Sequence, residues 1–84
     1  MTKEQINSVL KRSSESGFTT FLFSIKNRND IKGHFINARD YIHLNSKNYW
    51  YILKIEKKDE WLETQNPDLL LLFAGDSFSK IQMV

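Results

Sequence analysis

The sequence predicts a small, mainly β protein in which one N-terminal α-helix precedes a five-stranded antiparallel barrel. Three observations lead to this prediction. The 84 residues suit one domain. A helix-capping motif, followed by apolar residues at helical spacing, opens the chain. The rest alternates short apolar or aromatic segments with polar turns, and consecutive short strands favour a meander that curls into a barrel.

The first residues carry the signals of a helix. Thr2 and Gln5 have the spacing of a capping box, in which each side chain bonds the backbone N–H of the other residue. Apolar residues follow at positions 6, 9 and 10, and Gly17 suits the position just after a helix. We therefore expect a helix from about residue 3 to 14 and the barrel from about residue 18 to 84, within a single domain.

The first half of the barrel begins with a segment rich in β-branched and aromatic residues, 18–25. The polar residues 27–30 predict a turn, and residues 31–37 resume as a strand. Gly33 inside that strand indicates a bend or a close approach of two backbones. Residues 41–44 are expected to continue in strand conformation before a turn at 45–48.

The second half begins with the strongest strand signal in the chain, residues 49–55. Residues 57–66 are polar and suggest one helical turn. The apolar run 69–73, bounded by proline and glycine, is expected to be a buried strand. Residues 78–84 close the chain, with Phe78, Ile81 and Met83 as candidate core residues.

Three segments of this layout resemble the Sm-like (Lsm) family of small β-barrels. Lys26–Phe35 looks like the polar turn and glycine-containing strand of that family. Asp40–Asn45 is similar to the aspartate loop of the first Sm motif, and Leu72–Phe78 is placed like the second Sm motif. The resemblance implies an N-terminal helix on a strongly bent five-stranded barrel. An SH3-like barrel has nearly the same layout and stays open as an alternative.

The resemblance also implies an oligomeric RNA-binding protein, and the distribution of charge is compatible with that function. Residues 1–58 hold eleven Lys or Arg against five Asp or Glu, whereas residues 59–84 hold one Lys against five acids. A basic region attracts phosphate, and aromatic or amide side chains near it can stack on bases or bond their edges. The candidate RNA-binding residues are Arg28, Lys32, Arg39, Tyr41, His43 and Asn45.

A protein-interaction module, acting as a small regulator or inhibitor of another protein, is the alternative. Strand alternation puts Tyr49 and Tyr51 on one face and Trp50 on the other, and one of these faces is core. Trp61 lies in a charged segment where a core role is less obvious. Aromatic side chains of this kind often anchor partners. The candidate protein-binding residues are Tyr49, Trp50 and Trp61.

The sequence offers no set of residues for catalysis or for a cofactor. There is no cysteine, and the glycines are too scattered for a phosphate-binding loop. The two histidines, His34 and His43, lack an evident third ligand for a metal. We therefore expect a non-enzymatic protein with no catalytic residues, no metal and no cofactor.

Location and assembly follow from the same features. The polar start gives no signal peptide, and no run of 18 apolar residues predicts a membrane span, so we expect a cytoplasmic protein. The first and last strands of a small barrel expose unpaired backbone groups. We expect those edge strands to pair with neighbouring copies and give a homo-oligomer.

Overall fold

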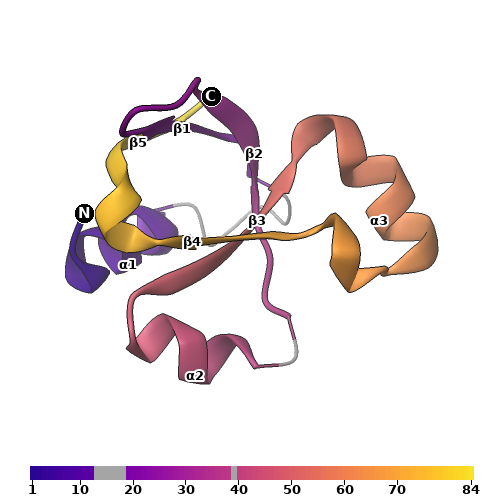
Figure 1. The fold of residues 1–84 in the computed structure, drawn as a ribbon, viewed down its shortest axis with the longest axis horizontal. Coiled ribbons are helices and arrows are strands. Elements are labelled where there is room, and N and C mark those ends of the chain that lie inside the picture. The colour runs from indigo at the N-terminus through magenta and orange to yellow at the C-terminus, as the bar shows by residue number, and fades with distance from the viewer. Residues whose placement is uncertain (13–18, 39) are drawn as a thin grey trace.

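The computed structural model describes residues 1–12, 19–38 and 40–84 and has a five-stranded antiparallel sheet at its centre (Figure 1). The strand order is β4-β3-β2-β1-β5. The strands are β1 (Phe21–Ile25), β2 (Ile31–Phe35), β3 (Tyr49–Lys54), β4 (Leu71–Ala74) and β5 (Phe78–Met83). The prediction of a mainly β protein with an N-terminal helix and five antiparallel strands is confirmed.

The sheet is not closed into a full barrel, which differs from the simplest form of the prediction. Within the described residues, no ladder joins β4 to β5. The two strands are separated by a short 3-10 helix, η3 (Gly75–Ser77), and the N-terminal residue lies against it. The Met1 ammonium group donates hydrogen bonds to the carbonyl oxygens of Gly75 and Phe78, at 2.8 and 2.9 Å. The chain's own first residue thus satisfies backbone groups between the two edge strands.

Helix α1 (Lys3–Arg12) begins with the capping box that the sequence predicts. The Gln5 backbone N–H donates to Thr2 Oγ1 at 3.2 Å, and the Thr2 backbone N–H donates to Gln5 Oε1 at 2.8 Å. The helix buries Ile6 and Val9 against the sheet. The expected last turn of this helix, Gly17 and the start of the following strand at Phe18 lie outside the described residues.

The sheet and α1 enclose one aromatic core. Phe21, Phe23 and Phe35 contact one another, with ring centroids 5.2–5.9 Å apart. The buried cluster consists of Ile6, Val9, Phe21, Phe23, Ile25, Trp50, Ile52, Phe73, Phe78 and Ile81. Gly33 is buried, and a Cβ atom there would lie 2.2 Å from the Leu53 carbonyl oxygen. The close approach of β2 and β3 at this glycine, expected from the sequence, is therefore confirmed.

Strand β5 departs from simple alternation because its pairing with β1 shifts register at Ser24/Ile25. The shift lets Phe78 and Ile81 both face the core, while Ser79 and Lys80 between them are exposed. Met83, at the last position of the strand, is 52% exposed, so its expected place in the core is wrong. In β4, Phe73 is buried but Leu72 is 48% exposed, because edge strand β4 is covered on one face only.

Two helices replace segments that the sequence predicts differently. Residues 41–44, expected as a strand, belong to helix α2 (Tyr41–Ser46), which lies between β2 and β3. The last bond of β2 to β3 joins the Ile36 N–H to the Tyr51 carbonyl oxygen. Beyond that point the chain satisfies its backbone locally, as in the bond from Leu44 N–H to the Asp40 carbonyl oxygen.

The polar segment after β3 also forms more helix than the single turn expected. It holds a 3-10 turn, η1 (Ile55–Lys57), followed by helix α3 (Lys58–Thr64). A further 3-10 turn, η2 (Pro67–Leu69), includes Leu69, the first residue of the apolar run 69–73 that is predicted as a strand. Among the described residues, no helix has the length and apolar character needed to cross a membrane.

Asn48 joins four parts of the fold. Its backbone has φ 64°, a left-handed conformation that asparagine tolerates better than most residues. Its Oδ1 accepts the indole N–H of the buried Trp50 at 2.8 Å, and its Nδ2 donates to the Met1 carbonyl oxygen at 3.1 Å. Its carbonyl oxygen accepts the Gly75 N–H at 2.7 Å, and its N–H donates to the Asn45 carbonyl oxygen. One residue thus connects α2, the core, the N-terminus and η3.

We predict that replacing Asn48 lowers the free energy of unfolding in two separable steps. Asn48→Gly keeps the left-handed backbone but leaves the Trp50 indole N–H unsatisfied, which costs about 1–3 kcal/mol. Asn48→Ala adds the cost of a Cβ at positive φ, about 1–2 kcal/mol more. Urea denaturation measures both values. An Asn48→Gly protein as stable as the parent would contradict this role of the amide.

A double-mutant cycle with Gly75 isolates the packing around the same amide. A Cβ on Gly75 would lie 2.1 Å from Asn48 Oδ1, so Gly75→Ala must displace that amide. Gly75→Ala is therefore expected to destabilise the parent protein by about 1–3 kcal/mol but to cost little in the Asn48→Gly background. Additive effects would show that the two residues act independently.

Candidate nucleic-acid interface

The structure divides the predicted RNA-binding residues between two regions. Arg28 lies in the turn between β1 and β2, with its guanidinium carbon 5.4 Å from the Phe73 ring centroid. Lys32 lies on β2, and hollows beside both residues share Asp30, Ile31 and Lys54. Tyr41, His43 and Asn45 lie on α2, which Figure 1 shows away from that turn. Arg39 lies outside the described residues.

The three residues proposed for protein binding also have different environments. Trp50 is 1% exposed and belongs to the core, which corrects its placement at a surface. Tyr49 is 42% exposed on the opposite face of β3, as the alternation predicts. Trp61 is half-buried on α3 and lines a hollow with Tyr51.

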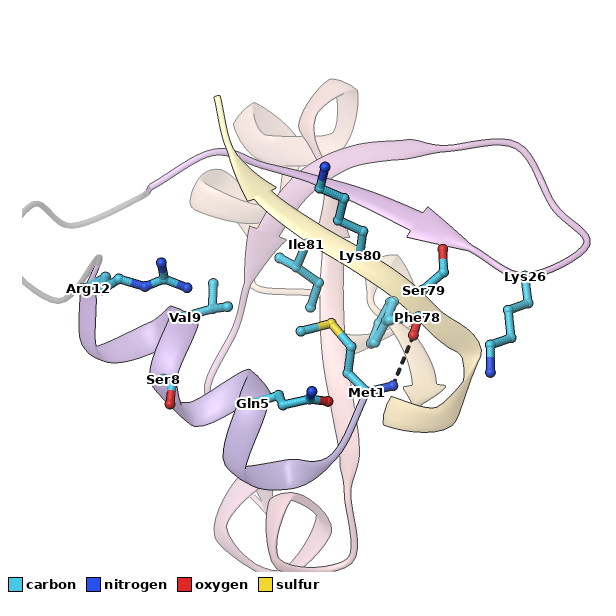
Figure 2. Close-up of a pocket in the computed structure, with 10 residues that line it drawn as sticks. All are labelled: Met1, Gln5, Ser8, Val9, Arg12, Lys26, Phe78, Ser79, Lys80 and Ile81. Carbon is cyan, nitrogen blue, oxygen red and sulfur yellow. Dashed lines mark hydrogen bonds between the residues drawn. The ribbon is translucent and has the colours of Figure 1, made fainter.

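A basic groove of about 660 Å³ lies between α1 and β5 (Figure 2). Its cationic side chains are Arg12 from the end of α1, Lys26 from the end of β1 and Lys80 from β5. Figure 2 shows the three at separate positions around the groove, with Arg12 and Lys26 at opposite sides. No carboxylate is among the described residues that line it. The basic groove therefore presents a spread of positive charge.

Local structure explains how residues from distant parts of the sequence come to line the same groove. On α1, Gln5, Ser8 and Arg12 lie along the side of the helix next to the buried Val9. On β5, the register shift turns Lys80 outward beside the buried Ile81. Lys26 is fixed at its backbone, since its N–H donates to the Ser77 carbonyl oxygen at 2.9 Å.

The three cations of the groove are available for a ligand. Within the described part of the chain, Arg12, Lys26 and Lys80 are exposed and form no ion pair. The two hydroxyl groups of the groove are already used, because Ser8 donates to the Glu4 carbonyl oxygen and Ser79 donates to the Ser24 carbonyl oxygen. Charge, rather than hydroxyl groups, is therefore the main attraction that the groove offers.

None of the three cations of the groove is among the RNA-binding residues predicted from the sequence, because they lie in segments far apart along the chain. In the sequence, Lys26 stands out only as the first residue of a segment that resembles the Sm-like family, and Arg12 and Lys80 do not stand out. A signal was present for each. Arg12 closes a helix whose last turn is basic, and Lys80 is the one cation of the acidic segment 59–84. Placing them together requires knowing that α1 packs beside β5, which neither segment indicates alone.

A second hollow, of about 460 Å³, has a different character. The described side chains that line it come from β3, α3, the residues just before α2 and the segment before β4. Tyr51 and Trp61 are its aromatic residues, and Asp40 is its charged residue. The Tyr51 hydroxyl donates to Asp40 Oδ1 at 3.1 Å. Burial of the phenol, that hydrogen bond and the negative charge of Asp40 all raise the pKa of Tyr51 above its ordinary value of 10.0.

No protein-family model, curated protein or solved structure matches this chain. A search of the described residues for groups of three or more possible metal ligands also finds none. His34 is buried on β2, where Nδ1 lies 3.0 Å from the Thr19 carbonyl oxygen, whereas His43 is exposed on α2. Functional inference therefore rests on the basic groove and the aromatic hollow.

Asp40→Asn should lower the pKa of Tyr51 toward 10.0, because the substitution removes the negative charge that opposes ionisation. A raised pKa means that the folded state holds the phenol proton more tightly than the unfolded state does. Its contribution to stability is therefore present below pH 10 and is lost as the pH rises through the folded-state pKa. Titration of the Tyr51 ring carbon by NMR measures the shift, and an unchanged value in Asp40→Asn would contradict the coupling.

Proposed function

We propose that the protein is a non-enzymatic binding module for single-stranded RNA and that the basic groove contacts the phosphates. The observation that carries this proposal is that Arg12, Lys26 and Lys80 all line one groove whose described lining holds no carboxylate. Lys and Arg side chains supply most of the affinity for nucleic-acid backbones by releasing bound counterions. The resemblance of three segments of the sequence to the Sm-like family favours RNA as the nucleic acid.

The positions of the cations suit an extended strand better than a single phosphate. They lie apart around the groove rather than in one cluster (Figure 2). Lys26 also begins the turn that carries Arg28, so the positive charge continues from the groove toward the β1–β2 hairpin. Lys32 follows on β2, although Asp30 and Glu56 share the hollow that it lines. We propose that a strand enters along the groove and leaves along the hairpin.

The acidic part of the chain does not cancel the charge of the groove. Helix α3 contains three acidic residues, Asp59, Glu60 and Glu63, and one basic residue, Lys58. Figure 1 shows α1 and α3 at opposite sides of the molecule, with the sheet between them. The acids of α3 therefore lie away from the groove, which would orient an approaching polyanion toward the groove.

RNA affinity should fall steeply with salt. If three phosphates are contacted, the binding constant for a fluorescein-labelled single-stranded oligouridylate falls about 20-fold between about 50 and 200 mM salt. Fluorescence anisotropy measures this slope. Affinity that does not change over the range would contradict phosphate binding.

Charge reversals should locate the contacts. Arg12→Glu, Lys26→Glu and Lys80→Glu are each expected to weaken binding and to flatten the salt slope, with a smaller loss for Arg28→Glu and Lys32→Glu at the hairpin. Lys47→Glu is the matched control, because Lys47 is an exposed cation that follows α2. An equal loss in Lys47→Glu would show that net charge, rather than the groove, governs binding.

We also propose that the edge strands pair between copies and give a homo-oligomer. β4 and β5 end the sheet, and both carry exposed apolar side chains: Leu72 on β4 and Met83 on β5. An exposed apolar edge without charge, as in β4, favours pairing with another strand.

A reducing compartment such as the cytoplasm suits a chain without cysteine.

Leu72→Lys should lower the mass of the assembly, since a charged side chain on an edge strand opposes strand pairing. Light scattering after gel filtration measures the mass. Leu62→Lys on α3 is the control, because Leu62 is exposed to a similar degree but lies away from both edges. A parent protein that elutes at 10.0 kDa would contradict self-association.

A further inference from the structure

We propose that the aromatic hollow between β3 and α3 binds an arginine side chain of a partner protein. The described linings of this hollow and of the basic groove have no residue in common, so the inference does not depend on RNA binding. Among the described residues, the lining of the hollow includes Asp40, Tyr51, Trp61, Pro67 and Leu70. Its volume of about 460 Å³ leaves room for one long side chain.

The apolar surfaces of the hollow suit the two halves of an arginine side chain. Trp61 is half-buried, so part of its indole surface remains open to a ligand. Indole is the aromatic ring that attracts a cation most strongly, and the planar guanidinium group lies flat on it. Pro67 and Leu70 offer apolar contact for the methylene stem.

Asp40 supplies the opposite charge. Its Oδ1 is held by the Tyr51 hydroxyl at 3.1 Å, which orients the carboxylate. Among the described residues, nothing donates a hydrogen bond to Asp40 Oδ2, so that oxygen can accept guanidinium N–H groups. Tyr51 keeps its proton at neutral pH and remains the donor. The described lining contains no Lys or Arg that would compete for the carboxylate.

The surroundings select a cation over a phosphate. Helix α3 carries the exposed acids Asp59, Glu60 and Glu63, and η2 carries Asp68, whereas Lys57 and Lys58 lie at the start of α3. None of these six residues is in the described lining of the hollow, and four acids against two lysines give the segment beside it a net charge of −2. This charge repels the backbone of a nucleic acid and attracts a basic peptide segment. A guanidinium group can meet the indole face and the carboxylate together, whereas an ammonium group presents a single point of charge.

The test uses a matched pair of peptides and the full chain labelled with nitrogen-15. Acetyl-Gly-Arg-Gly-amide should shift the NMR signal of the Trp61 indole N–H, with a dissociation constant on the order of 1 mM. The same peptide with citrulline, a neutral isostere of arginine, should not. The Trp50 indole signal serves as an internal reference, because Trp50 is buried and bonded to Asn48. Equal binding of both peptides, or of neither, would overturn the proposal.

Variants assign the contacts. Asp40→Asn and Trp61→Leu are each expected to weaken arginine binding at least about tenfold, whereas Leu62→Ala, at an exposed position beside Trp61, should leave it unchanged. Asp40 is exposed, so Asp40→Asn remains informative if Trp61→Leu fails to fold. If Asp40→Asn binds the peptide as well as the parent does, the proposal is wrong. A Trp61 shift caused by oligouridylate but not by the arginine peptide would assign the hollow to nucleic acid instead.

Discussion

The amide of Asn48 is the interaction on which the arrangement of the molecule depends most. The open side of the sheet brings together the N-terminus, η3 and the end of α2, and all three meet at this residue. The indole N–H of Trp50 would be left unsatisfied at the edge of the core without Oδ1. Asn48 also bonds the carbonyl oxygen of Met1, which immediately precedes the capping residue Thr2 of α1. The basic groove, one wall of which is α1, therefore depends on a residue that does not line it.

The fold places the basic groove and the aromatic hollow apart, a separation that the net charge and the composition do not reveal. The net charge is only +2, yet helix α3, with Asp59, Glu60 and Glu63, lies at the opposite side of the molecule from α1, which ends with Lys11 and Arg12 (Figure 1). Each side also has its own form of contact. The basic groove offers charge over an extended surface, whereas the aromatic hollow offers one indole, one carboxylate and apolar walls. A protein with both surfaces could hold an RNA and a basic protein segment at the same time.

Much of the fold could be predicted because its signals are local. The capping box at Thr2 and Gln5, the alternation around Trp50 and the close approach at Gly33 each follow from a few neighbouring residues. Helix α2 could not be predicted in this way. The residues Tyr41 to Leu44 suit a strand, but the described part of the chain holds no strand that pairs with them.

The two candidate surfaces are harder to predict, because they are assembled from distant segments. Arg12, Lys26 and Lys80 line one groove only because α1 packs beside β5. Trp61 looked unusual from its charged surroundings alone, and the structure adds the partners that line its hollow, Tyr51 and Asp40. The sequence shows that basic residues predominate before residue 59 and acidic residues after it, but only the fold shows which cations line the same groove.

The location of bound RNA tests the central claim most directly. Backbone amide signals of the nitrogen-15-labelled protein can be followed during titration with a single-stranded oligouridylate at low salt. The account predicts that the largest changes fall on α1, Lys26 and β5, that they continue into the β1–β2 hairpin, and that they reverse when salt is added. Changes confined to α2 or α3, or no change at all, would contradict it.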